Sequence, residues 1–455
     1  MKTENEMINN NQPTTIIIVG ISGDLSKRKL LPALAQIAAA GALPEHYKII
    51  GITRKNDLYV NELLVNVKNP KLISGNLELW KMDLSEIRDY KKFAEHLEEI
   101  EKEYSEPAQR LFYLAVPPQI SRPIVELLGL SGLAKAKNTK LLLEKPFGVD
   151  LASAQELVEH INRYFTADQV YRIDHYLAKE TAQNIIVFRQ DNSLFKRTWN
   201  SSFIERIEIS ASEIIGVEGR AVFYEQTGAL RDLVQSHLLQ LAALTLMDIP
   251  DGRQFSEIPG HRLAALKQLH LATDEAVSVN VKRGQYSSYQ AEIKNVGSTV
   301  ETFVSLTLES DNPRWQGVPI ILTTGKSLDK KFTGIRILYK KDESHEANQL
   351  VLRLQPDEGM ELSIYAKRPG YDHQVERHPL KFTFQEYYTS LPEAYEQVLF
   401  DAINSNHGLF TTSEEVLESW KIIDPIQKAW EMNSDDLIIY EPGSEIKKVL
   451  SLKKI

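Results

Sequence analysis

The sequence contains no cysteine among its 455 residues. This absence excludes a disulfide-linked scaffold, a thiolate zinc site, an iron–sulfur cluster and a cysteine nucleophile. Glycine and proline are also sparse, at 22 and 19 residues, which excludes collagen-like and low-complexity chains. The 42% apolar and 25% charged residues are typical of a globular protein. The length suggests two or three domains.

Long hydrophobic runs are missing as well. The stretch Leu238–Met247 is interrupted by Gln240 and Thr245 and is much shorter than the roughly 20 residues of a membrane-spanning helix. No membrane segment is therefore predicted. The first residues, MKTENEMINNNQP, have neither the basic region nor the apolar segment of a signal peptide. We expect residues 1–13 to form a disordered tail and the protein to be cytoplasmic.

Basic residues are outnumbered by acidic ones. The 53 lysines and arginines against 62 aspartates and glutamates give a formal charge of -9. A chain of this charge is not expected to bind nucleic acid or an anionic membrane, so an anionic ligand would need a local basic pocket. No cluster of ligands with metal-binding spacing is apparent, and no metal is predicted.

The first part of the chain alternates short apolar strands with longer helical patterns, as βα units around a parallel sheet do. The predicted strands are Thr15–Val19, Lys48–Thr53, Leu111–Val116, Lys140–Leu143 and Gln169–Ile173. Ligands of such sheets bind beyond the carboxyl ends of the strands. The segments that follow these strands should therefore meet in one crevice.

After about residue 180 the strands alternate apolar and polar residues, which indicates a sheet with one exposed face. The predicted strands are Phe203–Ala211, Val300–Leu308, Val318–Thr323, Gly334–Tyr339, Gln349–Leu354, Met360–Ala366 and Lys381–Phe384. Helical patterns cover Gly228–Met247, Ala394–Ile403 and Ser413–Ile423. We expect a Rossmann-like parallel-sheet domain over residues 14–180, followed by a larger α+β domain with a mainly antiparallel sheet over residues 181–455.

The segment Gly20-Ile21-Ser22-Gly23-Asp24-Leu25 follows the first strand and precedes a helix. Backbone N–H groups there can hold a dinucleotide pyrophosphate, although the pattern is not G-x-G-x-x-G and a tight turn would also explain the glycines. The second strand ends at Arg54, where NAD enzymes carry an acidic residue. Arginine suits the 2′-phosphate of NADP. Asp57 nearby keeps NAD as a weaker alternative.

Three polar segments at or near the predicted crevice are candidates for catalysis. Lys145 follows the fourth strand, and His175 and Lys179, four residues apart, could grip a phosphate. His237 lies on the apolar stripe of a predicted helix. A histidine on such a face is more often a satisfied core residue, but Asp174 could orient it as a general base near neutral pH.

Taken together, the motifs resemble the glucose-6-phosphate dehydrogenase family. The resemblance rests on order and spacing over residues 14–430, and its segments are Gly20-x-x-Gly23-Asp24-Leu25, Glu144-Lys145-Pro146-Phe147-Gly148, Arg172-Ile173-Asp174-His175-Tyr176-Leu177-x-Lys179-Glu180 and Gly228-x-x-Arg231-Asp232-x-x-Gln235-x-His237. It implies oxidation of glucose 6-phosphate to the 6-phosphoglucono-lactone by NADP+ in the oxidative pentose phosphate pathway, and a homodimer built on the second domain's sheet.

The resemblance also implies roles for individual residues. His237 would be the general base, with Asp174 holding its imidazole. The substrate-binding residues would be Lys145, His175, Tyr176, Lys179, Glu213, Glu225, Lys326 and Gln355. The cofactor-binding residues would be Gly20, Ser22, Gly23, Asp24, Leu25, Arg54, Tyr113 and Lys145.

The chain departs from the family pattern at four positions. Ser236 replaces an asparagine, Glu225 an aspartate, Thr323 an arginine and Ala178 a glycine. Arg353 matches a residue of a second, structural NADP site in some relatives, but we do not predict that site here. Two alternatives stay open: a related sugar dehydrogenase with an altered substrate, and a non-catalytic NADP(H) sensor.

Overall fold

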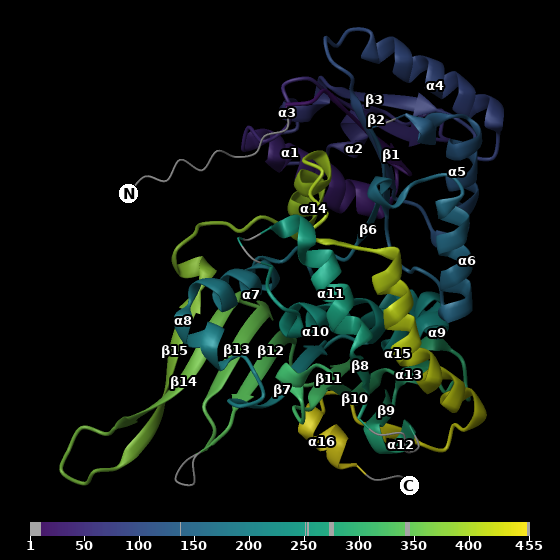
Figure 1. Cartoon of the computed structure of the whole chain (residues 1–455). Helices are drawn as coiled ribbons and strands as arrows, with labels where there is room; N and C mark the ends of the chain where they lie inside the picture. The colour runs from purple at the N-terminus through teal and green to yellow at the C-terminus, as the bar shows by residue number, and fades with distance from the viewer. Residues whose placement is uncertain are drawn as a thin grey trace.

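The computed structural model describes residues 11–136, 138–250, 252, 254–272, 277–341 and 346–452. Most of the predicted disordered tail, residues 1–10, lies outside the described residues. Two units are stacked in Figure 1, each built on its own sheet. No helix among the described residues is long and apolar enough to cross a membrane.

The first unit contains a seven-stranded sheet in the order β16-β6-β5-β4-β1-β2-β3. Its strands β1 to β6 are parallel, in the order of a dinucleotide-binding fold. Their bounds are Thr14–Val19, Tyr47–Thr53, Leu77–Lys81, Gln109–Leu114, Thr139–Leu143 and Val170–Ile173. The five predicted strands are confirmed. The sequence analysis missed β3, an edge strand whose alternating LELWK is only partly buried.

Helices cover both faces of this sheet (Figure 1). The longer ones are α1 (Leu31–Ala39), α4 (Ile87–Glu101), α5 (Pro118–Leu130) and α6 (Leu151–Asn162), and short helices α2 (Val60–Leu63) and α3 (Lys71–Ser74) lie between β2 and β3. The core strands β1 and β4 are buried along their whole length. Burial on both faces explains why their sequences are continuously apolar rather than alternating.

The second unit contains a ten-stranded sheet in the order β15-β14-β13-β12-β7-β11-β10-β9-β17, with β8 paired to β10. Most neighbours are antiparallel, and β7–β11 and β9–β17 are parallel. The bounds of β7 to β15 and of β17 are Ile204–Ser212, Leu269–Leu271, Val281–Tyr286, Phe303–Ser310, Ile320–Gly325, Phe332–Tyr339, Gln349–Gln355, Gly359–Lys367, Val375–Thr383 and Leu437–Tyr440. The predicted fold class is confirmed. The strands β8, β9 and β17 were not predicted.

Smaller helices complete the second unit. They are α7 (Glu180–Asp191), α8 (Ser193–Thr198), α9 (Ala221–Ala229), α11 (Ile258–Lys267), α12 (Val277–Asn280), α13 (Tyr289–Ile293) and α16 (Ile446–Ser451). The predicted helix Gly228–Met247 is the continuous segment η5 (Leu230–Leu238) and α10 (Leu239–Leu246). It is buried against the sheet, with Val234, Leu238 and Leu241 fully covered.

A sharp break at Gly228 separates α9 from η5. Gly228 has φ +61 and ψ -179, and a Cβ there would collide with the carboxylate of Glu301. That carboxylate accepts a hydrogen bond of 2.9 Å from the backbone N–H of Leu230, at the start of η5. Glycine is required here because the backbone is left-handed and the space is already occupied.

Late segments of the chain return to the first unit. Helix α14 (Ala394–Ile403) packs against α1, and its last carbonyls accept hydrogen bonds from the buried Lys140 ammonium. Strand β16 (Phe410–Thr411) pairs antiparallel with β6. Residues beyond the predicted boundary at 180 therefore extend the first sheet.

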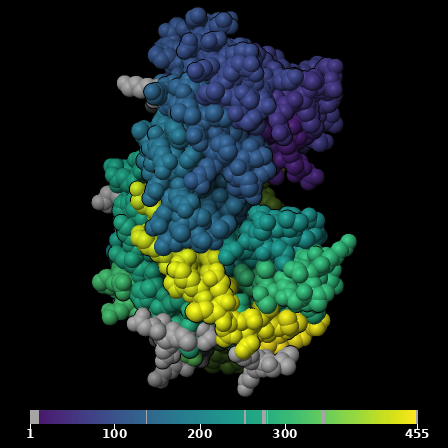
Figure 2. Space-filling model, turned by 90° about the vertical axis from the view of Figure 1, so that its right-hand side faces the viewer, coloured from purple at the N-terminus to yellow at the C-terminus, as the bar shows by residue number. Residues whose placement is uncertain are grey.

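Helix α15 (Ser413–Met432) joins the two units. It packs against α6 of the first unit and α11 of the second. Its Trp420 donates a 2.9 Å hydrogen bond to the carbonyl of Phe147. Figure 2 shows this helix in yellow, directly below the blue surface of the first unit.

A buried ion pair fixes the start of α15. Arg262 on α11 donates to the Glu415 carboxylate at 2.8 Å and to the carbonyls of Gly408 and Phe410 at 2.7 and 2.6 Å. Both side chains are almost fully buried, at 1% and 0% exposure. Breaking such a pair leaves an uncompensated charge in the interior.

We expect Arg262→Met to lower the free energy of unfolding by about 3–5 kcal/mol, since Glu415 and two carbonyls lose their donors. Chemical denaturation followed by fluorescence measures the loss. The matched control is Lys421→Met on α15, the helix that carries Glu415, because the half-exposed Lys421 pairs with Glu418 and surface pairs contribute little. Equal stability of the two variants would contradict the role of Arg262.

Candidate active site

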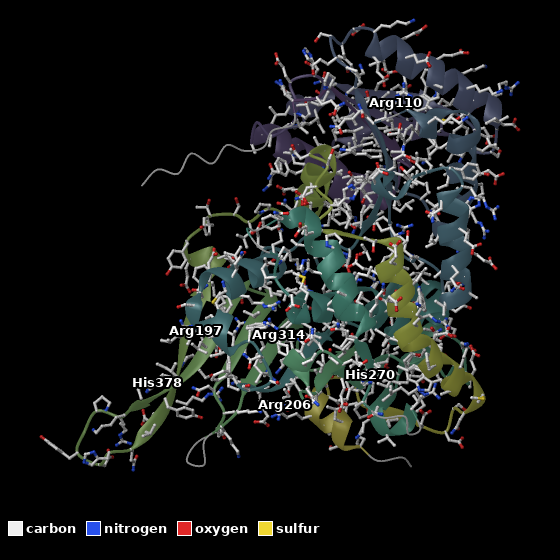
Figure 3. All side chains as sticks on the ribbon, in the orientation of Figure 1. Arg110, Arg197, Arg206, His270, Arg314 and His378 are labelled. Carbon is white, nitrogen blue, oxygen red and sulfur yellow. The ribbon has the colours of Figure 1, made fainter. Side chains whose placement is uncertain are left out.

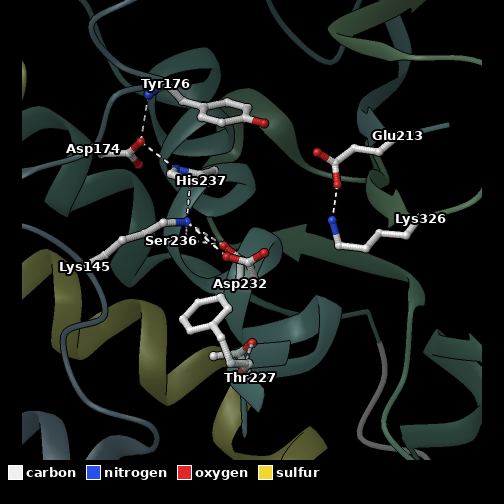
Figure 4. Close-up of polar contacts among 10 residues, drawn as sticks. Lys145, Asp174, Tyr176, Glu213, Thr227, Asp232, Ser236, His237 and Lys326 are labelled. Carbon is white, nitrogen blue, oxygen red and sulfur yellow. Dashed lines mark hydrogen bonds and ion pairs between the residues drawn. The ribbon is translucent and has the colours of Figure 1, made fainter. Parts of the chain in front are cut away.

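The candidate site lies where the carboxyl ends of β5 and β6 face η5. Lys145 follows β5, Asp174 and Tyr176 follow β6, and His237 comes from η5. Figure 4 shows these side chains converging from both units. The structure thus brings together residues that the sequence separates by up to 92 positions.

His237 and Asp174 form a buried pair. The Nδ1 of His237 lies 2.6 Å from Oδ1 of Asp174, and the backbone N–H of Tyr176 donates to the same oxygen at 2.9 Å. The side chains are 1% and 5% exposed. Burial alone would raise the pKa of Asp174, but the charge and hydrogen bond of His237 outweigh it and leave that pKa below its ordinary value.

The contacts of the imidazole fix its tautomer. Burial lowers the pKa of His237, against the opposing charge of Asp174. The Nζ of Lys145, which can only donate, lies 2.6 Å from Nε2 of His237. Nε2 is therefore the acceptor and Nδ1 carries the proton donated to Asp174. A neutral imidazole with an unprotonated Nε2 is what a general base requires.

Two aromatic rings fix the plane of this imidazole. Tyr176 stacks on His237 with ring centroids 4.1 Å apart and planes at 18°. The ring of His175 meets it edge-on at 4.8 Å. Burial, followed by the neighbouring charge of His237, lowers the pKa of His175 to about 3. His175 is therefore a neutral hydrogen-bonding group at neutral pH.

Lys145 is held by two further acceptors on η5. Its ammonium lies 3.0 Å from the carbonyl of Asp232 and 3.3 Å from the Oδ1 of the same residue. Ser236, which departs from the family pattern, donates to that carbonyl at 2.7 Å and lies 3.5 Å from the ammonium.

Asp232 is a site residue that the sequence analysis missed as a ligand. The segment η5 is wound as a π-helix, in which residues five apart lie on one face. Asp232 and His237 have this spacing, whereas the α-helical period used to interpret the sequence separates them. The signal available in the sequence was the acidic residue Asp232, five positions before the base His237.

Glu213 and Lys326 form a second polar group, which lies to the right of Asp232 in Figure 4. They follow the parallel strands β7 and β11, whose pairing places them side by side. Their side chains are joined in a hydrogen-bonded ion pair. Lys326 also lies over the ring of Tyr224, 5.2 Å from its centroid.

Lys179 and Gln355 form a third group. The ammonium of Lys179 lies 3.6 Å from Oε1 of Glu358. Gln355 donates to the hydroxyl of Thr333 at 3.0 Å, and that threonine is also hydrogen-bonded to Tyr176. Tyr176 thus connects the third group to the ring of His237.

Glu225 lies in a different network from these groups. Its carboxylate accepts hydrogen bonds from Tyr289 at 2.6 Å, Asn295 at 2.7 Å and Ser298 at 2.7 Å. Within the described part of the chain, the Glu225 carboxylate makes no hydrogen bond to Lys145, Asp174 or His237.

The predicted cofactor segment lies at the end of β1. Gly20 has φ +91, and a Cβ there would collide with the carbonyl of Ala115. Its own carbonyl accepts from the N–H of Gly23 at 2.9 Å and from the hydroxyl of Ser26 at 3.0 Å. This tight loop leaves Ser22, Asp24 and Leu25 between β1 and the following helical turn. Such a loop fits a dinucleotide.

Two more predicted cofactor residues occupy contrasting positions. Arg54 is exposed directly after β2, at the same edge of the sheet. Tyr113 in β4 is fully buried, and its hydroxyl donates to Glu144 at 2.5 Å. A cofactor would meet the Arg54 guanidinium directly, whereas Tyr113 is covered.

Both units of the chain match families of known proteins. Residues 17–184 match the family described as "Glucose-6-phosphate dehydrogenase, NAD binding domain", and residues 186–450 match "Glucose-6-phosphate dehydrogenase, C-terminal domain". The chain belongs to the glucose-6-phosphate dehydrogenase family. The resemblance predicted from the motifs is thereby confirmed.

Individual members of the family are similar over nearly the whole chain. Glucose-6-phosphate 1-dehydrogenase of Chlamydia muridarum is 36% identical, covering 92% of this chain and 90% of the relative. The Rhizobium meliloti protein of the same name is 36% identical, covering 95% and 94%. A solved structure titled "Glucose-6-phosphate dehydrogenase in complex with its substrate glucose-6-phosphate" has a TM-score of 0.89 at 31% identity, covering 97% of both chains.

We expect the imidazole of His175 to stay neutral between pH 8 and pH 5. Nitrogen NMR of selectively labelled protein should show no titration of His175 over this range, while the unfolded chain titrates near pH 6.5. Because the unfolded state alone takes up this proton, His175 removes folding stability as the pH falls below about 6.5. Titration of His175 near pH 6.5 in the folded protein would contradict the assigned environment.

Proposed function

We propose that the protein is an NADP-dependent glucose-6-phosphate dehydrogenase, which oxidises C1 of glucose 6-phosphate and releases 6-phosphoglucono-lactone. The observation that carries the proposal is the buried His237, with Nδ1 directed to Asp174 and the lone pair of Nε2 directed to the ammonium of Lys145. Membership of the family supports the substrate, and the exposed Arg54 after β2 supports the cofactor.

The chemistry required of the chain is removal of one proton. Nε2 of His237 accepts the proton of the C1 hydroxyl, and Asp174 stabilises the imidazolium that forms. When bound, NADP+ supplies the acceptor for the C1 hydride. The stacked Tyr176 keeps the imidazole plane fixed while its charge changes.

Lys145 must move slightly for the substrate to bind. Its ammonium occupies the lone pair of Nε2 that the C1 hydroxyl needs. The carbonyl and carboxylate of Asp232, at 3.0 and 3.3 Å, can retain the ammonium after it leaves Nε2. Lys145 then lies beside the reacting oxygen and can stabilise negative charge on it.

The remaining polar groups suit a phosphorylated sugar. We assign Lys179, Tyr176 and the neutral His175 to the 6-phosphate. We assign the sugar hydroxyls to Glu213, Lys326, Gln355 and Asp232. Glu225 stays a predicted sugar contact, and its three present donors would have to be exchanged for sugar hydroxyls.

The cofactor proposal distinguishes NADP from NAD through one side chain. Arg54 follows β2, where a 2′-phosphate would lie in this fold. Its side chain is exposed, and its charge contributes to lowering the pKa of Asp83 without a close ion pair between the two. Gly20, Ser22, Gly23, Asp24 and Leu25 would hold the pyrophosphate. NAD+ remains the weaker alternative.

A homodimer built on the second sheet is part of the proposal. Strands β14 and β15 form a ribbon that projects from the body of the molecule, and His378 lies on it in Figure 3. Val375 and Leu380 of β15 are 44% and 54% exposed. Exposed apolar side chains on an unpaired edge are a feature that a partner subunit would cover. The cytoplasmic location stays a prediction.

Replacing His237 by asparagine should lower kcat by about 10²–10⁴-fold with little change in KM, because the base is lost and the binding groups remain. Absorbance of the reduced nicotinamide, with glucose 6-phosphate and NADP+, measures both constants. Full activity of the variant would contradict the role of His237, and an inactive wild type would favour the altered-substrate or sensor alternatives.

Replacing Arg54 by alanine should raise KM for NADP+ by at least tenfold and change KM for NAD+ less than twofold, since only NADP+ carries the 2′-phosphate. Steady-state kinetics with each cofactor measure the difference. The control is Arg88→Ala, an exposed arginine on α4. A similar loss with both cofactors would assign Arg54 to the shared part of the dinucleotide.

A further inference from the structure

A small cavity lies beside the catalytic pair. It is enclosed by residues that follow β5 and β6 and by η5, α10, β16 and α15, and its volume is about 20 Å³. That is room for roughly one water molecule. Its polar lining includes Asp174, Gln240, Thr411 and Ser419.

Two oxygen atoms of this lining have no hydrogen-bond partner among the described residues. They are Oδ2 of Asp174 and Oε1 of Gln240, on side chains of residues that are only 4% and 2% exposed. The other oxygen of Asp174, Oδ1, already accepts two hydrogen bonds. An unpaired buried acceptor costs about 1–3 kcal/mol, and more when it is charged, so buried acceptors in native proteins nearly always have a protein or water partner.

We propose that the cavity binds one ordered water, which donates its two hydrogens to Oδ2 of Asp174 and Oε1 of Gln240. The two hydrogens of water match the two acceptors, and the hydroxyl of Thr411 is available to donate to one of its lone pairs, whereas the hydroxyl of Ser419 already donates to the carbonyl of Glu415 at 2.9 Å. Gln240 is then a positioning residue, which acts on His237 through the water and Asp174.

The water would lower the pKa of the His237 imidazole. A donor on Oδ2 draws negative charge away from Oδ1, the atom that receives the proton of His237. Asp174 then stays ionised but holds the imidazolium less tightly. Other ionisable groups also face the pair. Lys145, Asp232, His175 and Tyr176 lie beside His237, and Glu144 and Tyr395 lie near Asp174. A substitution at Gln240 replaces none of them.

A crystal structure of the free protein tests the occupancy. We expect density for a water about 2.7–3.2 Å from both Oδ2 of Asp174 and Oε1 of Gln240. A cavity without density, or a direct contact between the two side chains, would overturn the proposal. Occupancy does not depend on turnover, so this result stands apart from the test of the proposed function.

The effect on catalysis rests on the proposed function and is tested with Gln240→Leu, which removes the acceptor and keeps most of the volume. We expect the acid limb of the kcat profile to move to higher pH, so that kcat falls on that limb, while KM for glucose 6-phosphate changes less than twofold. The limb moves up because Asp174, without its donor, favours protonated His237.

The matched control is Thr245→Val on the same helix. Thr245 is buried and its hydroxyl donates to the carbonyl of Leu241, but it does not line the cavity. This variant should lose stability and keep the pH profile of the wild type. An unchanged profile in Gln240→Leu, or the same shift in both variants, would overturn the positioning role.

Discussion

The hydrogen bond between His237 and Asp174 is the constraint on which the rest of the structure depends. It joins the end of β6 in the first unit to the helix at the centre of the second, across 63 residues of sequence. A pair this buried is functional only if its geometry is held from both sides. The features around it supply that support: η5 starts at a break that only glycine fits, and α15 docks against both units.

The second sheet also helps to position the His237–Asp174 pair. It presents Glu213 and Lys326 at the ends of adjacent parallel strands, while its face covers the helix that carries His237. Meanwhile α14 and β16 extend the first sheet from late in the chain. In the proposed function, a sugar phosphate would contact groups of both units, and the dinucleotide would lie against the loop after β1 in the first.

Much of this arrangement follows from sequence patterns, for identifiable reasons. The buried parallel strands are continuous apolar runs, and the residues after them carry the polar motifs, so the crevice could be predicted. Strand β3 could not, because it is a half-exposed edge. Asp232 was not recognised as a ligand because π-helical winding changes the spacing that places residues on one face. The partners of Glu225 come from α13 and the loop after it, 64 to 73 residues away, and tertiary contacts of that kind leave no local signal.

The departures from the family pattern are also explained by location. Thr323 lies within β11, 3% exposed, and shares a hydrogen bond of 2.9 Å with Ser305 on the neighbouring strand. Its replacement of an arginine therefore alters the interior of the sheet rather than the surroundings of His237. Ser236 is different, because it lies beside Lys145 and bears directly on the position of that ammonium.

The ion pairs of the candidate site indicate which kind of ligand it would favour. Each of its three lysines is already paired with a carboxylate: Lys145 with Asp232, Lys326 with Glu213 and Lys179 with Glu358. The three pairs sum to zero charge, so a simple anion gains little by entering. A sugar phosphate offers an anion to a lysine and hydroxyl donors to the carboxylates, and it can exchange partners with all three pairs. Pairing in the free protein thus favours a ligand that carries both kinds of group.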